Sequence, residues 1–225
     1  MGNTVVITGA NRGIGLSLAR QYHESGAKVF AICRKKSPAL EKIGAQVIDG
    51  IDLQQEESAS ILKESLQGVS INCLINNAGI LRNEILGDIN YKTIQEQFQV
   101  NTLAPLRISE ALKDQLNPGE DGFSRLVFIT SRMGSIEDNT SGGRYGYRMS
   151  KAALNMAAVS LSSDLSANGV AVGILHPGLV GTDMIGGAGD LTPDEAAAKL
   201  ILRIKEITPD TTGQFRHSNG QSLPW

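Results

Sequence analysis

The sequence predicts an α/β protein with a doubly wound parallel sheet of about seven strands and helices on both faces. Short runs that are almost purely apolar, beginning with Thr4–Ile7, alternate six times with segments of helical periodicity. A glycine-rich turn at Thr8–Gly15 joins the first apolar run to the first helical segment. Neither a repeat nor a linker interrupts this pattern, so we expect one domain over residues 1–225.

The strands are expected where β-branched and aliphatic residues follow one another with little polar interruption, as in strands buried on both faces. The first strand is Thr4–Ile7 by this criterion, and the sixth ends before Pro177, because the residue before a proline stays extended. The other strands are expected at Lys28–Cys33, Gln46–Asp49, Ile71–Ile75, Phe123–Thr130 and Val170–Leu175, with a final short strand near Gly213–Phe215.

The helices are expected where apolar residues recur every three or four positions between those strands. They run from about Leu16 to Gly26, Glu56 to Leu66, Asn90 to Leu116, Tyr145 to Asn168 and Pro193 to Ile207. The third contains Pro105, which has no N–H to donate to the carbonyl of Asn101. We expect that carbonyl to be free for water, either incidentally or as part of a proton relay.

The composition argues against several classes of function. The chain has 21 basic and 23 acidic residues, a formal net charge of −2, so nothing favours nucleic-acid binding. Its two cysteines and three histidines lack metal-ligand spacing, and we expect no metal site. No apolar run could cross a bilayer and no signal peptide is recognisable. Met1-Gly2 does not predict myristoylation, because Val6 stands where serine or threonine is needed. The cytoplasm is the expected compartment.

The glycine-rich turn predicts a nucleotide site. Glycines let the backbone approach a diphosphate, whose charge is stabilised by the N-terminus of the following helix. The spacing differs from the G-x-G-x-x-G pattern, and the alternative is a tight turn that only packs the helix on the strand. The position between strand and helix favours the nucleotide. The expected contacts come from Gly9, Asn11, Arg12, Gly13, Ile14 and Gly15.

The end of the second strand bears on the choice of cofactor. Dinucleotide folds that use NAD place an acidic residue about 20 residues past the turn, where it binds the ribose hydroxyls. This chain has Arg34 there, followed by Lys35 and Lys36, and Arg12 in the turn. Arginine can bind phosphate bidentately, so a 2′-phosphate, and hence NADPH, is favoured over NADH. The two lysines are expected to be solvated charges.

Tyr147 and Lys151 form a candidate catalytic pair. Four residues apart on a helix, they share one face, and an ammonium beside a phenol favours the phenolate and lowers the pKa of the tyrosine. Taken alone, the pair also fits two solvated side chains on a first helical turn. A site is favoured because this pair, like the other motifs, lies just beyond the carboxyl end of a strand. His176, at another strand end, is expected to be structural rather than catalytic.

Together these motifs resemble the classical short-chain dehydrogenase/reductase family over essentially the whole chain. The resemblance rests on Thr8-Gly-x-x-x-Gly13-x-Gly15, Asn76-Asn77-Ala78-Gly79, Ser131, Tyr147-x-x-x-Lys151 and Pro177-Gly178, in the family's order. The ending, with Gly213-Gln-Phe, Asn219-Gly220 and Leu223-Pro224-Trp225, is most similar to the C-factor and sniffer-type carbonyl reductase branch. The resemblance implies a Rossmann-type fold and an NAD(P)-dependent oxidoreductase.

The resemblance also implies a role for each motif residue. Tyr147 would be the general acid, Ser131 would hydrogen-bond the substrate carbonyl, Lys151 would lower the tyrosine pKa and hold the nicotinamide ribose, and Asn101 would anchor a relay water. Asp52 and Leu53 would flank the adenine, and Asn77, Ala78 and Gly79 would line the ribose side. Val180 and Thr182 would hold the carboxamide end of the cofactor, beside Pro177 and Gly178.

One spacing departs from the family pattern. Ser131 and Tyr147 are 16 residues apart, a few more than usual, and the surplus falls in the loop Asn139–Gly143. That loop can bulge without moving either side chain, and Ser135 is a weaker alternative for the serine role. The segment after Gly181 is short and glycine-rich, which suggests an open, permissive substrate pocket.

Two functions of different classes follow. The first is an NADPH-dependent reductase that converts a ketone or aldehyde to an alcohol, with Tyr147 as the acid. The alternative is a nucleotide-binding signalling protein of the C-factor type, acting through a partner. The intact serine, tyrosine, lysine and asparagine set favours the enzyme, because a pure binder has no need of it. We expect a small-molecule substrate, no nucleic acid or membrane, and a homodimer or homotetramer formed through the small residues after Tyr147.

Overall fold

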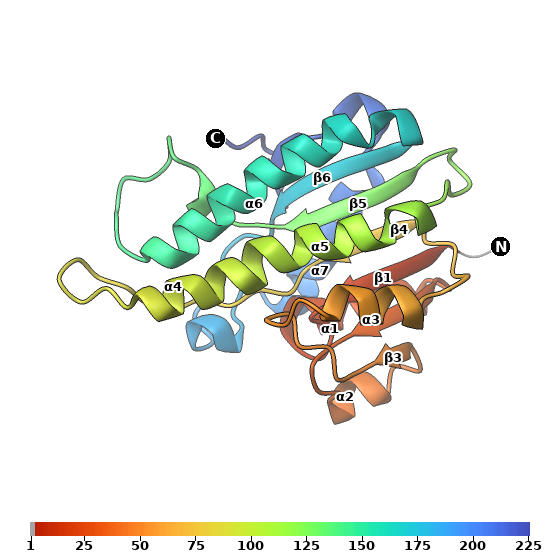
Figure 1. Cartoon of the computed structure of the whole chain (residues 1–225), viewed down its shortest axis with the longest axis horizontal. Coiled ribbons are helices and arrows are strands. Elements are labelled where there is room, and N and C mark those ends of the chain that lie inside the picture. Colours follow the sequence, from red (N-terminus) through yellow and green to blue (C-terminus); the bar gives the residue numbers. More distant parts are fainter. Residues whose placement is uncertain (1–2) are drawn as a thin grey trace.

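In the computed structural model, which describes residues 3–225, seven parallel strands form one sheet in the order β3-β2-β1-β4-β5-β6-β7 (Figure 1). The central strand β1 pairs with both β2 and β4, so the chain winds outward in two directions, as predicted. The Met1-Gly2 start lies outside the described residues. The strands are β1 Thr4–Thr8, β2 Lys28–Ile32, β3 Gln46–Ile48, β4 Cys73–Asn76, β5 Ser124–Ile129, β6 Val170–His176 and β7 Phe215–His217.

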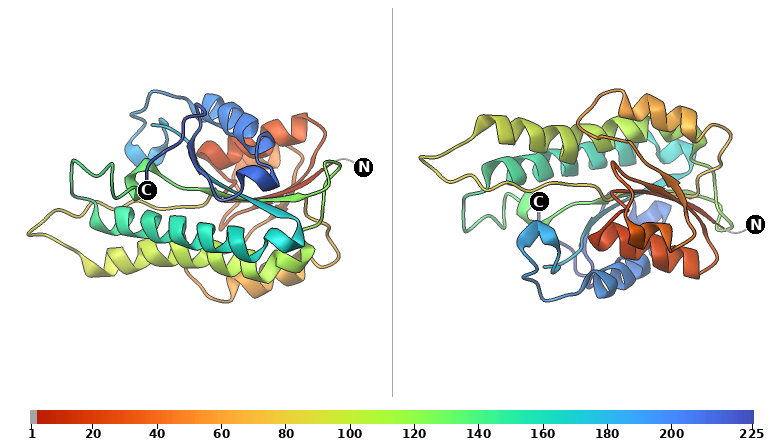
Figure 2. Two further views of the ribbon diagram at one scale, coloured as in Figure 1. Left: turned by 90° about the horizontal axis from the view of Figure 1, so that it is seen from above. Right: turned by 90° about the horizontal axis from the view of Figure 1, so that it is seen from below.

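Helices cover both faces of the sheet. Figure 2 shows α4, α5 and α6 on one side and α1 and α7 on the other. The α-helices are α1 Gly13–Glu24, α2 Pro38–Glu41, α3 Ser58–Ser65, α4 Tyr91–Phe98, α5 Ala104–Leu112, α6 Tyr145–Asp164 and α7 Pro193–Lys205. Shorter helical turns occupy Gln99–Leu103, Lys113–Gln115, Arg132–Gly134, Ser166–Asn168, Asp183–Ile185 and Pro209–Thr211. None of the helices within residues 3–225 has both the length and the apolar content to span a membrane.

Each face of the sheet has its own apolar core, because side chains alternate between the two faces along every strand. On one face Phe128 belongs to a buried cluster with Leu154 of α6, and on the other Ile7 belongs to one with Leu200 of α7. Burial on both faces explains why the strand sequences are nearly continuous apolar runs. The loops at the carboxyl ends of the strands are therefore anchored in strands that are packed on both faces.

The long helix predicted for Asn90–Leu116 is continuous but irregular. Asn90 caps α4 by accepting hydrogen bonds from the N–H groups of Lys92 and Thr93 at 3.0 and 3.3 Å. The helix widens into a π-helical turn at Gln99–Leu103 before α5 begins. Pro105 removes a donor at this point, which accounts for the irregularity. Such turns recur at functional sites.

Two other elements differ from the sequence prediction. The final strand covers Phe215–His217 rather than Gly213–Phe215, because Gly213 has a φ of 76° and the ladder with β6 begins only at Phe215. The short helix α2 was not expected. Its start is fixed by Ser37, whose hydroxyl accepts the N–H of Leu40 at 3.2 Å.

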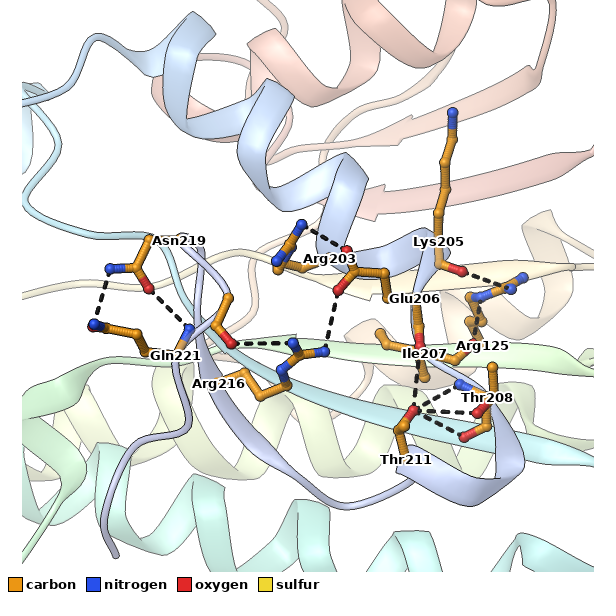
Figure 3. Close-up of polar contacts among 11 residues, drawn as sticks. Arg125, Arg203, Lys205, Glu206, Ile207, Thr208, Thr211, Arg216, Asn219 and Gln221 are labelled. Atoms are coloured by element: carbon orange, nitrogen blue, oxygen red, sulfur yellow. Dashed lines mark hydrogen bonds and ion pairs between the residues drawn. The ribbon is translucent and has the colours of Figure 1, made fainter.

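The C-terminal segment is tied to β5 and to the end of α7 (Figure 3). Arg125 of β5 donates from Nε to the carbonyl of Ile207 at 3.2 Å, and Arg216 of β7 pairs with Glu206 at 3.2 Å. Beyond β7 the chain returns toward the end of β5, where the Trp225 carbonyl accepts a hydrogen bond from the N–H of Glu137 at 2.8 Å. The tail therefore supports the loop that follows Ser131.

Candidate active site

A cleft of about 650 Å³ opens at the carboxyl ends of the strands, where a doubly wound sheet is expected to bind its ligand. We refer to it as the strand-end cleft. Most residues predicted to bind a cofactor line it: Gly9, Asn11, Arg12, Gly13, Ile14, Gly15, Arg34, Asp52, Leu53, Asn77, Ala78, Gly79, Tyr147, Lys151, Pro177 and Thr182. Segments far apart in the sequence therefore converge on one cavity.

The glycines of the turn are required by close backbone packing. A Cβ on Gly15 would lie 2.3 Å from the carbonyl oxygen of Gly9 and 2.5 Å from Nδ2 of Asn77. Gly9 has a φ of +68°, and a Cβ there would lie 2.9 Å from Cα of Ala78. Asn77 itself donates from Nδ2 to the carbonyl of Thr8 at 3.0 Å, which binds the two strand-end segments together. The result is an open helix N-terminus at the cleft floor, suited to an anion.

Cations line the side of the cleft near β2. Arg34 and Lys35 are in its wall, whereas Lys36 is not and pairs with Glu41 at 2.9 Å. Arg12 also lines the cleft and pairs with Asp183 at 3.2 Å. No carboxylate stands at the Arg34 position, so the residues present fit a phosphorylated ribose better than two free hydroxyls.

Tyr147 and Lys151 lie on the first turns of α6, and both are buried. The ammonium nitrogen of Lys151 is 5.9 Å from the centroid of the Tyr147 ring and donates to the carbonyl of Ile129 at 2.9 Å. Tyr147 lines the strand-end cleft and also an adjoining cavity of about 310 Å³, which we call the side pocket. Ser131 lines that side pocket too. The phenol therefore stands at the junction of two cavities.

Burial changes the acid–base properties of both groups. It raises the pKa of the Tyr147 phenol, while a hydrogen bond with Ser131 and the charge of Arg144 act in the opposite direction. Burial lowers the pKa of Lys151 to about 8. The effect of Lys151 on the tyrosine pKa, which the resemblance implies, stays a prediction.

Asn101 lies within the π-helical turn and is fully buried. Its side chain accepts the N–H of Ile80 at 2.8 Å and donates to the carbonyl of Ile80 at 2.9 Å and to Oγ of Ser150 at 3.0 Å. Between it and the lysine lies Gly79, where a Cβ would come within 3.3 Å of Asn101 Oδ1 and 3.7 Å of Lys151 Nζ. Asn101 thus lines neither cavity and lies behind Gly79 of the cleft wall.

Several predicted residues lie elsewhere. Gly178 and Val180 line the side pocket rather than the strand-end cleft. Ser135 lines neither cavity; its hydroxyl accepts the N–H of Asp138 at 3.0 Å and donates to the carbonyl of Trp225 at 3.2 Å. The structure thus brings Ser131, and not Ser135, to the same pocket as Tyr147.

His176 lines the side pocket but is held neutral. Burial lowers its pKa to about 3, and its ring meets the edge of His217 with centroids 4.8 Å apart. A neutral imidazole packed against a second one agrees with the structural role expected from the sequence.

Sequence reasoning missed further lining residues. Ile129 is the last residue of β5 and Thr130 follows it, so both could have been found because ligands bind at the carboxyl ends of the strands. No sequence pattern pointed to Arg144, which lines the side pocket and precedes α6. Glu84 was also missed: its carboxylate is buried and accepts the N–H of Gly146, next to Tyr147, at 3.1 Å.

Comparison with known proteins gives consistent matches. A family model described as "short chain dehydrogenase" matches residues 3–190. A Rhodococcus sp. (strain AD45) protein named 1-hydroxy-2-glutathionyl-2-methyl-3-butene dehydrogenase is 41% identical over 229 residues, covering 99% of this chain and 100% of the relative. The C-signal protein of Myxococcus xanthus is 41% identical over 156 residues, which are 69% of this chain and 93% of that protein. The NADPH-bound carbonyl reductase from chicken fatty liver superposes with a TM-score of 0.88 at 30% identity, covering 100% of this chain and 99% of that one.

Proposed function

The chain belongs to the short-chain dehydrogenase family of oxidoreductases, and we propose that it is an NADPH-dependent reductase of a ketone or aldehyde. The observation that carries this proposal is the position of Tyr147 between two cavities. A cofactor in the strand-end cleft and a substrate in the side pocket would meet at its hydroxyl. Ser131 stands in the same pocket and offers a second hydroxyl there.

The cofactor assignment rests on the fit of the strand-end cleft. The glycine turn leaves room for a diphosphate at the N-terminus of α1, and Arg34 and Arg12 supply the cations for a 2′-phosphate. The structural relative from chicken has NADPH bound, which supports the same choice. When bound, the cofactor supplies the hydride that reaches the carbonyl carbon.

The protein's own groups manage the proton and the developing charge. A phenol whose pKa is raised by burial stays protonated at neutral pH, so Tyr147 is ready to donate to the carbonyl oxygen. Ser131 donates a hydrogen bond to the same oxygen and stabilises its negative charge. Lys151, with a pKa of about 8, is mostly protonated at neutral pH and can hold a ribose hydroxyl. A water on the main chain of Asn101 would return a proton through this lysine.

The same residues serve the reverse reaction, the oxidation of an alcohol. The Rhodococcus relative is named as a dehydrogenase of a glutathionyl alcohol. A substrate panel should therefore include ketones, aldehydes and a glutathionyl alcohol, with NADPH loss or NADPH formation as the readout.

The decisive test of the catalytic assignment is Tyr147→Phe. The ring still fills its space, so NADPH affinity should change little, whereas turnover should fall by about 10²–10⁴-fold because the proton donor is lost. Single-turnover reduction of an accepted carbonyl with saturating cofactor measures this step directly. A rate near that of the parent protein would refute the role of Tyr147.

The likeness to the C-signal protein favours a second candidate, a nucleotide-binding signalling protein. In that case the Phe variant would keep full signalling activity and no carbonyl in the panel would be reduced. We also propose a cytoplasmic location, since Cys33 and Cys73 are free thiols, and a homodimer or homotetramer through α6. A monomer in light scattering at working concentration would exclude the assembly.

A further inference from the structure

The side pocket carries an excess of positive charge. Arg132, Arg144 and Arg148 line it, and Asp138 is the carboxylate in its wall. Arg132 forms an ion pair with Asp138, which neutralises both. Within residues 3–225, neither Arg144 nor Arg148 forms an ion pair, so two guanidinium charges in the pocket wall have no carboxylate partner.

Arg144 has a backbone conformation that arginine rarely adopts. Its φ and ψ are 49° and 45°, and among residues 3–225 it is the only residue other than glycine with a positive φ. This left-handed conformation is unfavourable for an ordinary residue, and asparagine or glycine would be better accommodated. A residue held in a strained conformation at a cleft points to a function for its side chain.

Arg144 is exposed, and the polar contacts of its side chain are to uncharged groups. Arg144 is the N-cap residue of α6, yet its side chain makes no capping hydrogen bond. Its Nε donates to Oδ1 of Asn83 at 3.2 Å, and its Nη1 approaches Sδ of Met133 at 3.8 Å. Both partners are uncharged. The nearby carboxylate of Glu84 bonds to Gly146 and to neutral side chains rather than to the guanidinium.

The position of Arg144 relative to the catalytic tyrosine is favourable for a ligand. Arg144 and Tyr147 both line the side pocket. Arg148 follows one turn later on α6 and is held by Oγ of Ser141 at 2.8 Å. Apolar side chains also line the pocket, among them Leu81, Met133, Leu179, Met184 and Ile185.

We propose that Arg144 binds a carboxylate of the substrate, so that the enzyme acts on carbonyl compounds that carry an ionised carboxylate. A guanidinium and a carboxylate match in bidentate geometry, and an uncompensated arginine in a partly apolar pocket favours such a partner. The apolar wall would hold the hydrocarbon part between the carboxylate and the carbonyl beside Tyr147. Arg148 adds to the positive potential without direct contact. This inference rests on the proposed reductase activity, whose substrate class it names.

The test compares a series of straight-chain oxo acids of increasing length with their methyl esters. The parent protein should prefer at least one acid over its ester in kcat/KM, mainly through KM. Arg144→Asn should lower the ratio of kcat/KM for that acid to kcat/KM for its ester by about ten- to a hundredfold, since a hydrogen bond to a charged group is lost for the acid alone. Asparagine tolerates the left-handed conformation, so the variant should fold. Arg82→Asn is the matched control, an exposed arginine outside both cavities.

Equal kcat/KM for every acid and its ester in the parent protein would overturn the proposal, as would an equal loss for both substrates in Arg144→Asn. A binding measurement separates this from failure of the proposed function. Calorimetric titration of the Tyr147→Phe protein, with NADP bound, should show the oxo acid binding at least tenfold more tightly than its ester. That preference should disappear when Arg144→Asn is added. Acid binding without any turnover by the parent protein would refute the reductase and leave the carboxylate site intact, whereas no acid preference in binding would refute the site.

Discussion

The buried carboxylate of Glu84 should be essential for holding the start of α6. Its Oε1 accepts hydrogen bonds from Nε2 of Gln97 at 2.7 Å and Oγ1 of Thr93 at 3.0 Å, and its Oε2 accepts the N–H of Gly146 at 3.1 Å. All three donors meet one side chain that is 1% exposed. Gly146 immediately precedes Tyr147, so these bonds fix the first turn of α6.

Replacing Glu84 with Gln leaves the shape unchanged but replaces an acceptor by a donor. In one orientation the new amide faces the N–H of Gly146, and in the other it faces the two donors of Gln97 and Thr93. At least one of the three hydrogen bonds to this side chain is then lost, a hydrogen bond to a charged group being worth about 1.5–3 kcal/mol, and the remaining bonds lose their charge assistance. We expect the free energy of unfolding to fall by about 2–4 kcal/mol, a large part of the 5–15 kcal/mol typical of a native protein.

Urea unfolding followed by circular dichroism measures this loss. The matched control is Glu110→Gln on α5, an exposed glutamate whose replacement should change the stability by less than about 0.5 kcal/mol. Because the first turn of α6 also carries the phenol, turnover by Glu84→Gln should fall under conditions in which the variant is fully folded. If Glu84→Gln unfolds at the same urea concentration as the control, the carboxylate does not hold the helix start and the reasoning is wrong.

Two further predictions concern the strand-end cleft. Arg34→Asp should weaken NADPH binding by about ten- to a hundredfold and improve NADH binding, because a charge-assisted hydrogen bond is replaced by repulsion. Lys36→Asp is the control, since it makes the same change of charge outside the cleft and should have little effect. Equal NADH and NADPH affinity in the parent protein would contradict the assignment. Lys151→Met should remove a pH dependence of stability. The Lys151 pKa is lowered to about 8 in the folded protein, so between pH 8 and the usual lysine value of 10.5 the unfolded chain binds more protons than the folded one. As pH rises through that range, the free energy of unfolding of the parent protein should therefore rise by up to about 3 kcal/mol relative to the variant. Urea unfolding of both proteins at several pH values tests this, and parallel profiles would show that the lysine is not desolvated.

The sequence alone determined the fold and which motifs line the strand-end cleft. Apolar runs such as Thr4–Ile7 can be satisfied only by burial on both faces, and their alternation with helical segments dictates a parallel sheet. The carboxyl ends of parallel strands share one edge, so the glycine turn and the Tyr147–Lys151 pair were bound to meet there. Local chemistry and strand direction sufficed for these inferences.

Only the tertiary structure decided which groups act on one another. Ser131 lines the side pocket and Ser135 does not, because the hydroxyl of Ser135 donates a hydrogen bond to the carbonyl of Trp225 in the C-terminal tail, 90 positions away. The left-handed backbone of the exposed Arg144 carries no local signal, and neither does the burial of Glu84, since a charged residue in a polar loop is ordinarily solvated. Their roles arise from a φ of 49° and from donors on other elements. The backbone conformation at a loop end and the burial of a side chain by distant segments depend on the packing of the whole chain, so no short stretch of sequence predicts them.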